Sequence, residues 1–219
     1  MRAAILLLRS PDFIFRMNFR CVTTPHRTSL RVIFRLRQYF FLIVLLAATT
    51  LHAAELRVGN SYRLTFTDVD QDQLSTSDGH VTIFSVVTRE NEPKAQALGD
   101  RVPKQYYGDP KYRLINIVNF QQGIFAPVRG VIMAIIRHRL DAEAKNLQKV
   151  YSERKVKRNP RDDIYVVADF DGKAVSQLGI APKSSEFAVF IFDGRGRLVG
   201  RWNDVPSAEA ITAALEEAR

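Results

Sequence analysis

Thiol and imidazole groups are the side chains best suited to catalysis or metal binding, and this sequence holds few of them. The 219 residues include one cysteine, Cys21, and four histidines. Only His80 and His138 lie beyond residue 54, and they are too far apart in the sequence for the short ligand spacing of a zinc site. Thiol–disulfide exchange requires a thiolate. We therefore expect no metal site and no thiol chemistry in residues 55–219.

Carboxylates are frequent, but their patterns are those of turns. Asp68 and Asp70 (DVDQD) and Asp169 and Asp171 (DFDG) lie in polar segments, where Asp side chains bond to nearby backbone N–H groups. A calcium loop would need more oxygen ligands and a later glutamate. The sequence contains no Gly-rich phosphate loop, no Gly-x-Ser-x-Gly and no His-Glu-x-x-His motif. It therefore predicts no cofactor and no catalytic residue.

The first 54 residues have the layout of a secretory signal peptide. Basic residues precede an uninterrupted apolar run, Tyr39–Ala48 (YFFLIVLLAA), and small residues follow it in Thr49–Ala54. The basic residues are Arg27, Arg31, Arg35 and Arg37. The apolar run is short for a bilayer span, which needs about 20 residues. We predict a cleaved leader at residues 1–54 that contains Cys21, with Met1 or Met17 as its start. An uncleaved N-terminal anchor is the alternative.

The formal net charge of +9 comes mostly from this leader. Eight of the 32 Lys and Arg residues, but one of the 23 Asp and Glu residues, lie in residues 1–54. Residues 55–219 are left with 24 basic and 22 acidic side chains. A nucleic-acid-binding protein carries basic charge on its folded domain, so nucleic acid is not an expected partner. The remaining chain is long enough for one sizeable core, and we predict a single domain without a disulfide.

Apolar periodicity predicts alternating strands and helices in residues 55–219. The runs His80–Thr88 and Tyr112–Phe120 are nearly continuous, as in central strands that are buried on both faces. Further strands are predicted at 62–68, 163–169, 187–193 and 197–202. Helices are predicted at 90–102, 128–154 and 208–218, with a short helix or turn at 172–178. Segment 71–79 is polar and turn-rich.

Two of the predicted helices are supported by specific side-chain patterns. An apolar stripe in the long helix is formed by Ile132, Ile136, Leu140, Leu147 and Tyr151. Ser207 is placed to cap the last helix. Strands that alternate with helices and then close with a hairpin and a helix predict an α/β fold. We expect a three-layer sandwich in which a mixed central sheet is flanked by helices.

Three segments of this order resemble the thioredoxin-like superfamily, in particular its redoxin or peroxiredoxin-like branch. LTFTDVDQDQLSTSDGHVTIFSVV (64–87) is similar to the opening of that branch, with the pair Gly79-His80 before the first buried strand. FAVFIFDGRGRLVGRW (187–202) resembles its closing hairpin, and the final amphipathic helix matches as well. The resemblance covers about residues 56–219 and implies a thioredoxin-like fold.

The same resemblance places the family's active site at Thr88–Lys94 (TRENEPK), without its cysteines. Counting from Gly79, the Cys-x-x-Cys positions fall on Asn91-Glu92-Pro93-Lys94, and Thr88 falls where peroxiredoxins have a threonine. The family's cis-proline position falls on Phe187. An amide cannot form a thiolate. The chain therefore resembles a member that lacks the active-site cysteines, in which disulfide reductase and peroxidase activity are not expected.

Two regions are candidate binding sites. The first is Thr88–Lys94, the active-site position without cysteines, which we call the degenerate loop. It would lie at the carboxyl end of a central strand, where α/β sheets bind ligands, and at a helix N-terminus, which attracts anions. Its candidate residues are Thr88, Arg89, Glu90, Asn91 and Lys94. The second is the basic segment Lys145–Arg161, with seven basic residues and one acid. Contacts with an anionic partner are predicted for Lys149, Arg154, Lys155, Lys157, Arg158 and Arg161. Either region could instead be ordinary solvated surface.

These features predict a periplasmic or secreted thioredoxin-fold protein that acts as a non-catalytic binding or scaffold module in the cell envelope. Its partner would be an unidentified protein or an anionic envelope component. Two alternatives remain open. One is a non-redox enzyme that uses the degenerate loop with Glu90 or His80 as acid or base. The other is a membrane-surface protein that is held by an uncleaved leader and the basic segment.

Overall fold

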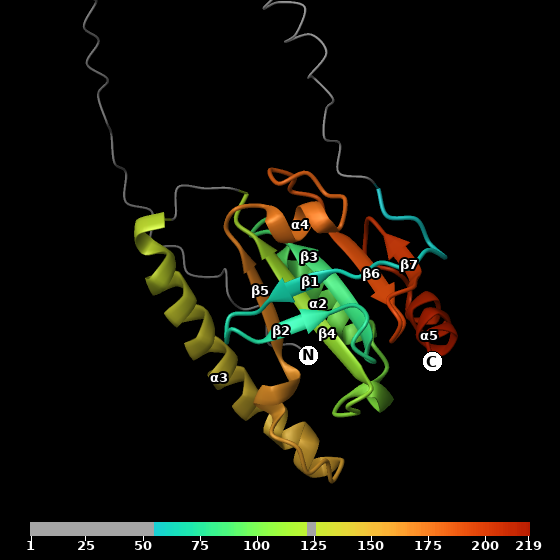
Figure 1. The fold of residues 1–219 in the computed structure, drawn as a ribbon. Coiled ribbons are helices and arrows are strands. Elements are labelled where there is room, and N and C mark those ends of the chain that lie inside the picture. Colours follow the sequence, from blue (N-terminus) through green and yellow to red (C-terminus); the bar gives the residue numbers. More distant parts are fainter. Residues whose placement is uncertain (1–54, 122–125) are drawn as a thin grey trace, which may run out of the picture. The chain divides into compact units, whose positions relative to one another are not determined.

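The central sheet organises the part of the chain that the computed structural model describes, residues 55–121 and 126–219 (Figure 1). The predicted leader, with Cys21, lies outside the described residues. The sheet consists of β3 (Val81–Val87), β4 (Tyr112–Asn119), β5 (Tyr165–Asp169), β6 (Ala188–Phe192) and β7 (Leu198–Trp202). Their order is β5-β4-β3-β6-β7. β3, β4 and β5 run parallel, whereas β6 is antiparallel to β3 and β7 to β6.

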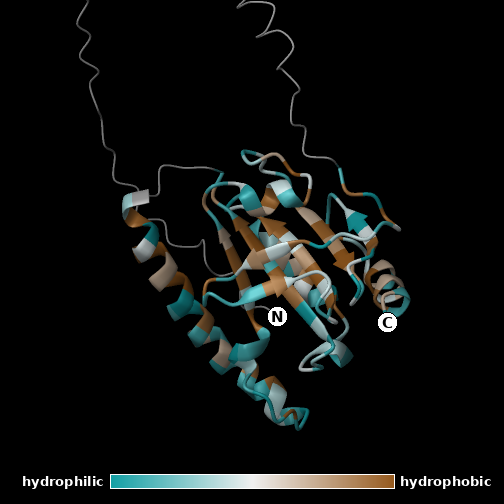
Figure 2. Cartoon of the chain, in the orientation of Figure 1, coloured by the Kyte–Doolittle hydropathy of each residue, from teal (hydrophilic) through white to brown (hydrophobic). Residues whose placement is uncertain are grey.

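The two strands predicted to be central are the most completely buried. Every residue of β3 is buried, and so is every residue of β4 after Tyr112. Helices and loops cover both faces of this sheet, so strands in its middle must be apolar on both sides. Figure 2 shows the apolar strands enclosed by more polar outer elements. The prediction of two central strands is confirmed.

Each face of the sheet has its own cover. Helices α2 (Glu92–Arg101) and α5 (Ala208–Glu217) pack on one face. Helix α4 (Lys173–Gln177) and a small two-stranded sheet cover the other. Ser207 caps α5 as predicted, because its Oγ accepts a hydrogen bond from the Ala210 N–H at 3.2 Å. None of the described helices combines the length and the apolar content that crossing a membrane requires.

Helix α3 (Arg129–Glu153) runs beside β5 (Figure 1). The predicted apolar stripe packs against Val118 and Val166, on β4 and β5. Four of its members are buried, and Ile132 is half-buried. Three short 3-10 helices, η2 (Lys104–Tyr106), η3 (Ala126–Val128) and η4 (Pro160–Asp163), connect the larger elements.

The prediction for residues 62–79 was wrong in two details. The predicted strand 62–68 is reduced to β1 (Thr65–Thr67), and the segment predicted as turn contains β2 (Gln73–Ser75). The two strands pair antiparallel and form a separate sheet. A side chain from the central sheet helps to hold them, because the buried Arg113 guanidinium donates to the carbonyl of Ser75. Such a contact over 38 residues leaves no local pattern in the sequence.

Candidate functional site

The degenerate loop joins β3 to α2, and Asn91 is the residue just before the helix. Pro93 lies in the first helical turn, where its missing N–H group is not needed. Arg89 and Glu90 are exposed at the tip of the loop. Thr88 and Asn91 are turned inward, with 2% and 7% of their surface exposed. The loop therefore presents charged groups to solvent and neutral ones to the interior.

Both polar atoms of the Asn91 amide are bonded to the protein itself. Its Oδ1 accepts a hydrogen bond from the Thr88 backbone N–H at 2.7 Å, which closes the loop. Its Nδ2 donates to the Ser185 carbonyl at 3.0 Å, in the segment that leads into β6. The side chain at the family's nucleophile position thus ties together two segments that are 94 residues apart.

A second amide holds the same segment. Asn119, the last residue of β4, is 3% exposed, and its Nδ2 donates to the Ser184 carbonyl at 3.1 Å. Its Oδ1 accepts from the Gln121 N–H at 2.8 Å. We call Asn91 and Asn119, with the carbonyls of Ser184 and Ser185, the amide clamp. It fixes the segment before β6 to the carboxyl ends of two central strands.

The clamp decides what chemistry the loop can do. An amide has no proton that is lost near neutral pH and no nucleophilic lone pair comparable to a thiolate. Beside it, the Thr88 Oγ is buried and has no hydrogen-bond partner among the described residues. No cis peptide bond occurs in the described part of the chain, and Phe187, at the family's cis-proline position, is buried at the start of β6.

Lys94, at the position of the family's second cysteine, takes part in a surface ion pair. Its Nζ lies 3.0 Å from Asp204 Oδ1, in the connection between β7 and α5. A backbone hydrogen bond from Val205, helped by Lys94, lowers the pKa of the Asp204 carboxyl. Both side chains are largely exposed, so this pair contributes little to stability.

The two acid–base candidates are not brought together. Glu90 is at the carboxyl end of β3, whereas His80 precedes its first residue. A seven-residue strand separates them by roughly 20 Å, at about 3.3 Å per residue. His80 Nδ1 contacts Asp78 Oδ1 at 3.0 Å, and Arg113 pairs with the same carboxylate. His80 therefore belongs to a structural network at the other end of the strand.

The predicted aspartate turns are present. Asp68 Oδ1 accepts from the N–H groups of Asp70 and Asp72, and Asp169 Oδ2 accepts from the Val175 N–H. Burial raises the pKa of both Asp68 and Asp169, and neighbouring aspartates add to the effect. No group of three or more His, Cys, Asp or Glu residues in the described ranges is arranged to hold a metal ion.

The basic segment divides its arginines from its lysines. Arg154 donates to the Tyr107 carbonyl at 2.9 Å, Arg158 pairs with Asp163 at 2.9 Å, and Arg161 pairs with Asp141 at 3.1 Å. Arg161 also pairs with Asp70. All three predicted arginines are thus bonded to the protein itself. A groove of about 350 Å³ between α3 and η4 lies beside them.

The lysines of the segment are arranged differently. Lys145, Lys149, Lys155 and Lys157 are exposed, and their ammonium groups make no hydrogen bond or ion pair with another described residue. Six residues were predicted to contact an anionic partner. Of these, only Lys149, Lys155 and Lys157 have charged groups without a bonded partner among the described residues. Lys145 belongs to the segment but was outside that prediction.

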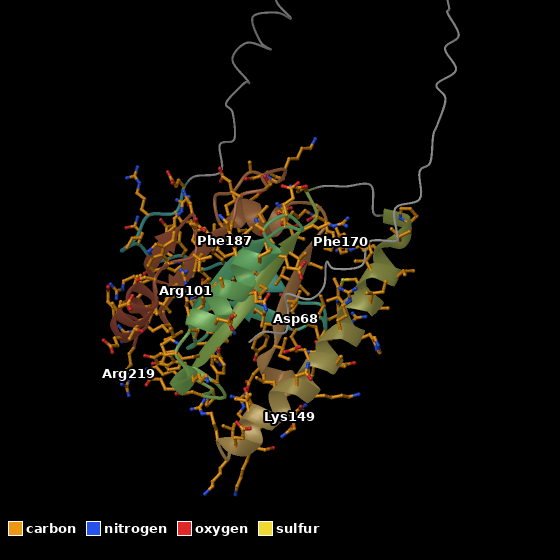
Figure 3. The ribbon with its side chains drawn as sticks, turned by 180° about the vertical axis from the view of Figure 1, so that it is seen from behind. Asp68, Arg101, Lys149, Phe170, Phe187 and Arg219 are labelled. Carbon is orange, nitrogen blue, oxygen red and sulfur yellow. The ribbon has the colours of Figure 1, made fainter. Side chains whose placement is uncertain are left out.

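Asn119 and the Ser184–Ser185 backbone were missed by the sequence analysis. Asn119 had a weak signal, because it is a polar residue at the end of an otherwise apolar run. Ser184 and Ser185 had none, since they contribute only carbonyl groups. Figure 3 shows Phe187, just after this segment, and Phe170, just after β5, at the same end of the molecule.

Comparison with known proteins finds similarity only among solved structures. No protein-family model and no curated protein matches the sequence. Among solved structures, the chain is similar to the exposed lipoprotein thioredoxin of Streptococcus pneumoniae, with 14% identity and a TM-score of 0.43. This match covers 71% of this chain and 99% of that one.

Two further structures are similar to the same extent. A thiol-disulfide oxidoreductase from Bacteroides fragilis matches with 15% identity and a TM-score of 0.43, over 73% of this chain and 100% of that one. A peroxiredoxin-like protein from Aquifex aeolicus matches with 12% identity and a TM-score of 0.42, over 74% and 88%.

Strand order and direction define the class. Three parallel strands followed by helices, an antiparallel hairpin on the other side of β3 and a closing helix make a thioredoxin-like fold of the redoxin type. Residues 55–219 contain no cysteine, so the fold is present without the active-site pair.

Proposed function

We propose that this chain is an exported thioredoxin-fold protein that works as a non-catalytic binding or scaffold module in the cell envelope. The observation that supports this most directly is the Asn91 amide. It is buried, and both of its polar atoms are bonded to backbone groups. The position that carries the reactive sulfur in related folds is here a structural cross-link. Export is proposed from the signal-peptide pattern of residues 1–54.

The experiment is a pair of activity assays on the chain with Cys21→Ser. Thiol-dependent reduction of insulin and consumption of hydrogen peroxide are measured against a redox-active thioredoxin and a peroxiredoxin. We expect no turnover above the buffer in either assay. Turnover by this cysteine-free variant would overturn the proposal, because the activity would need a reacting group other than a thiol.

Export is tested separately by the intact mass of the protein recovered from the envelope of its native host. A mass that begins near Ala54 or Glu55 is expected. A mass that retains residues 1–54 would refute cleavage and favour the membrane-anchored alternative. The enzyme alternative receives no specific support, since Glu90 is exposed at the loop tip and His80 lies at the opposite end of β3.

A further inference from the structure

Helix α3 carries a second stripe on the side away from the sheet. Positions that recur at alternating spacings of three and four residues lie on one face of a helix. Six such positions on α3, together with Val128 just before the helix, are all exposed: Val128, Val131, Ile135, His138, Ala142, Lys145 and Lys149. We call this set the outer stripe. It is separate from the buried stripe, and its character changes from apolar to basic along the helix.

The apolar end of the outer stripe is unusual for this protein. Val128, Val131 and Ile135 are 42%, 60% and 48% exposed. They are three of the four large hydrophobic side chains that are exposed among the described residues. The inner side of the same turns is anchored, because Arg129 lies 4.8 Å above the Phe170 ring and Ile136 is buried. The protein therefore presents this apolar surface from a helix that is fixed on its other side.

The basic end of the outer stripe has unpaired charge. Lys145 and Lys149 are followed by Lys155 and Lys157 just beyond the helix, and none has a bonded partner among the described residues. The neighbouring arginines are bonded to protein carbonyls and carboxylates. Arginine suits fixed, bidentate pairs, whereas lysine is a mobile point charge on a flexible stem. This division leaves a row of charges free for an anionic surface.

Charge excludes a second copy of the chain as the occupant. If two outer stripes packed in parallel, Lys145 and Lys149 would face the same lysines of the partner. If they packed antiparallel, lysines would face Val131 and Ile135. Neither arrangement gives both the apolar end and the basic end of the outer stripe a complementary surface. A coiled coil with another helix would also need several heptads of apolar positions, and the outer stripe supplies apolar anchors over only two turns.

We propose that the outer stripe binds the surface of an anionic lipid membrane. The three aliphatic side chains would enter the boundary between headgroups and acyl chains, and the lysines would lie against the lipid phosphates. Helices with one apolar region and flanking lysines bind in this way, and a convex helix face fits a deformable surface without a preformed groove. This inference rests on the proposed non-catalytic function and names its partner.

The test places a reporter on the outer stripe of the full chain. In a Cys21→Ser background, Val131→Cys carries an environment-sensitive fluorophore, and a matched protein carries it at Ala208→Cys. Ala208 is exposed at the start of α5, which lies at the other edge of the sheet from α3 (Figure 1). Vesicles of phosphatidylcholine with and without phosphatidylglycerol are added, and the emission shift and quenching by iodide are measured.

We expect a blue shift and protection from iodide at position 131 only with phosphatidylglycerol, and no change at position 208. Each lysine near an anionic membrane contributes a factor of about five in affinity. Lys145→Glu with Lys149→Glu should therefore weaken binding at least about 25-fold. Lys183→Glu, at an exposed lysine in the loop before β6, should leave it unchanged.

An unchanged, quenchable label at position 131 overturns the proposal, and so does binding that survives both charge reversals. Protection of the label by an envelope protein extract but not by vesicles would assign the surface to an acidic protein instead, and would also overturn it. These results are independent of the redox assays. Turnover by the cysteine-free chain refutes the proposed function, whereas a failed vesicle experiment without turnover refutes only the membrane contact.

Discussion

Replacing Asn91 with alanine should destabilise the protein more than most substitutions in a loop, because this side chain is buried and hydrogen-bonded. The Thr88 N–H, in a residue that is 2% exposed, would lose its acceptor and remain unsatisfied. Leaving a buried donor unpaired costs about 1–3 kcal/mol. The Ser185 carbonyl would also lose a bond, but Ser185 is exposed and water can replace it, at a cost of about 0.5–1 kcal/mol.

The sum predicts that Asn91→Ala lowers the free energy of unfolding by about 1.5–4 kcal/mol. The usual penalty for removing a helix N-cap does not add to this, because the Asn91 side chain makes no capping bond to α2. Urea unfolding followed by circular dichroism gives the value. Asn146→Ala is the matched control, since this exposed amide bonds only to Glu143 on the surface of α3. We expect the control to change stability by less than about 0.5 kcal/mol.

The second half of the clamp sharpens the test. Asn119→Ala should destabilise to a similar extent, and the double variant should lose about 0.5–1 kcal/mol less than the sum of the two single losses. The reason is that both amides fix the same segment, Ser184–Ser185, which can be released only once. If the free energy of unfolding of Asn91→Ala is within about 0.5 kcal/mol of that of the parent protein, the amide clamp is not a structural cross-link and our account of the site is wrong.

Four other substitutions test the fold. Gly196 has a φ of +84°, and an added Cβ would lie 2.5 Å from a backbone oxygen, so Gly196→Ala should cost about 3 kcal/mol. Gly130 in α3 has open space, so Gly130→Ala should stabilise by about 0.5–1 kcal/mol in the same urea assay. Ser207→Ala removes the α5 cap and should cost about 1 kcal/mol, measured by thermal unfolding. Burial opposes ionisation of Asp78, but hydrogen bonds from its histidine and arginine neighbours outweigh it and lower the pKa below the ordinary 3.8. The folded state therefore gains stability above that value and loses it as pH falls through the lower folded pKa. Unfolding measured below about pH 4 should show a shallower pH dependence for Asp78→Asn.

Local apolar patterns made most of the fold predictable from the sequence. β3 and β4 were identified because a strand buried on both faces must be a continuous apolar run. α3 was found within a residue of its bounds, because its buried stripe repeats with the helical period. β2 was missed, since its three residues, of which only Leu74 is apolar, become a strand through pairing with β1 and the bond from Arg113.

The position of the degenerate loop in the fold was predictable from the sequence, but the hydrogen bonds made by its residues were not. Counting from Gly79 located Asn91 at the start of α2, where the structure places it. The partner of its amide is a backbone carbonyl 94 residues away, and a carbonyl has no residue-type signature. The basic segment shows the same limit. Its seven basic residues look equivalent in the sequence. Only the contacts of the folded chain show that its arginines are bonded to the protein and its lysines are not.

The amide clamp gives the Asn91 end of the molecule a structural role, whereas the outer stripe is the surface for which we propose binding. A thiol at position 91 could not both accept from Thr88 and donate strongly to Ser185, because sulfur is a weak hydrogen-bond partner. Asn91 is buried and both of its polar side-chain atoms are bonded to backbone groups, so this side chain is not accessible to a reactant. A surface that binds without chemistry has the opposite requirement, since it needs exposure and unpaired charge. In the described part of the chain, α3 and the lysines that follow it combine exposed apolar side chains with unpaired charge, whereas the degenerate loop exposes charged residues such as Arg89 and Glu90 but no large apolar side chain. The membrane-binding proposal therefore predicts that charge reversal in the outer stripe weakens binding and leaves stability unchanged, whereas Asn91→Ala lowers stability.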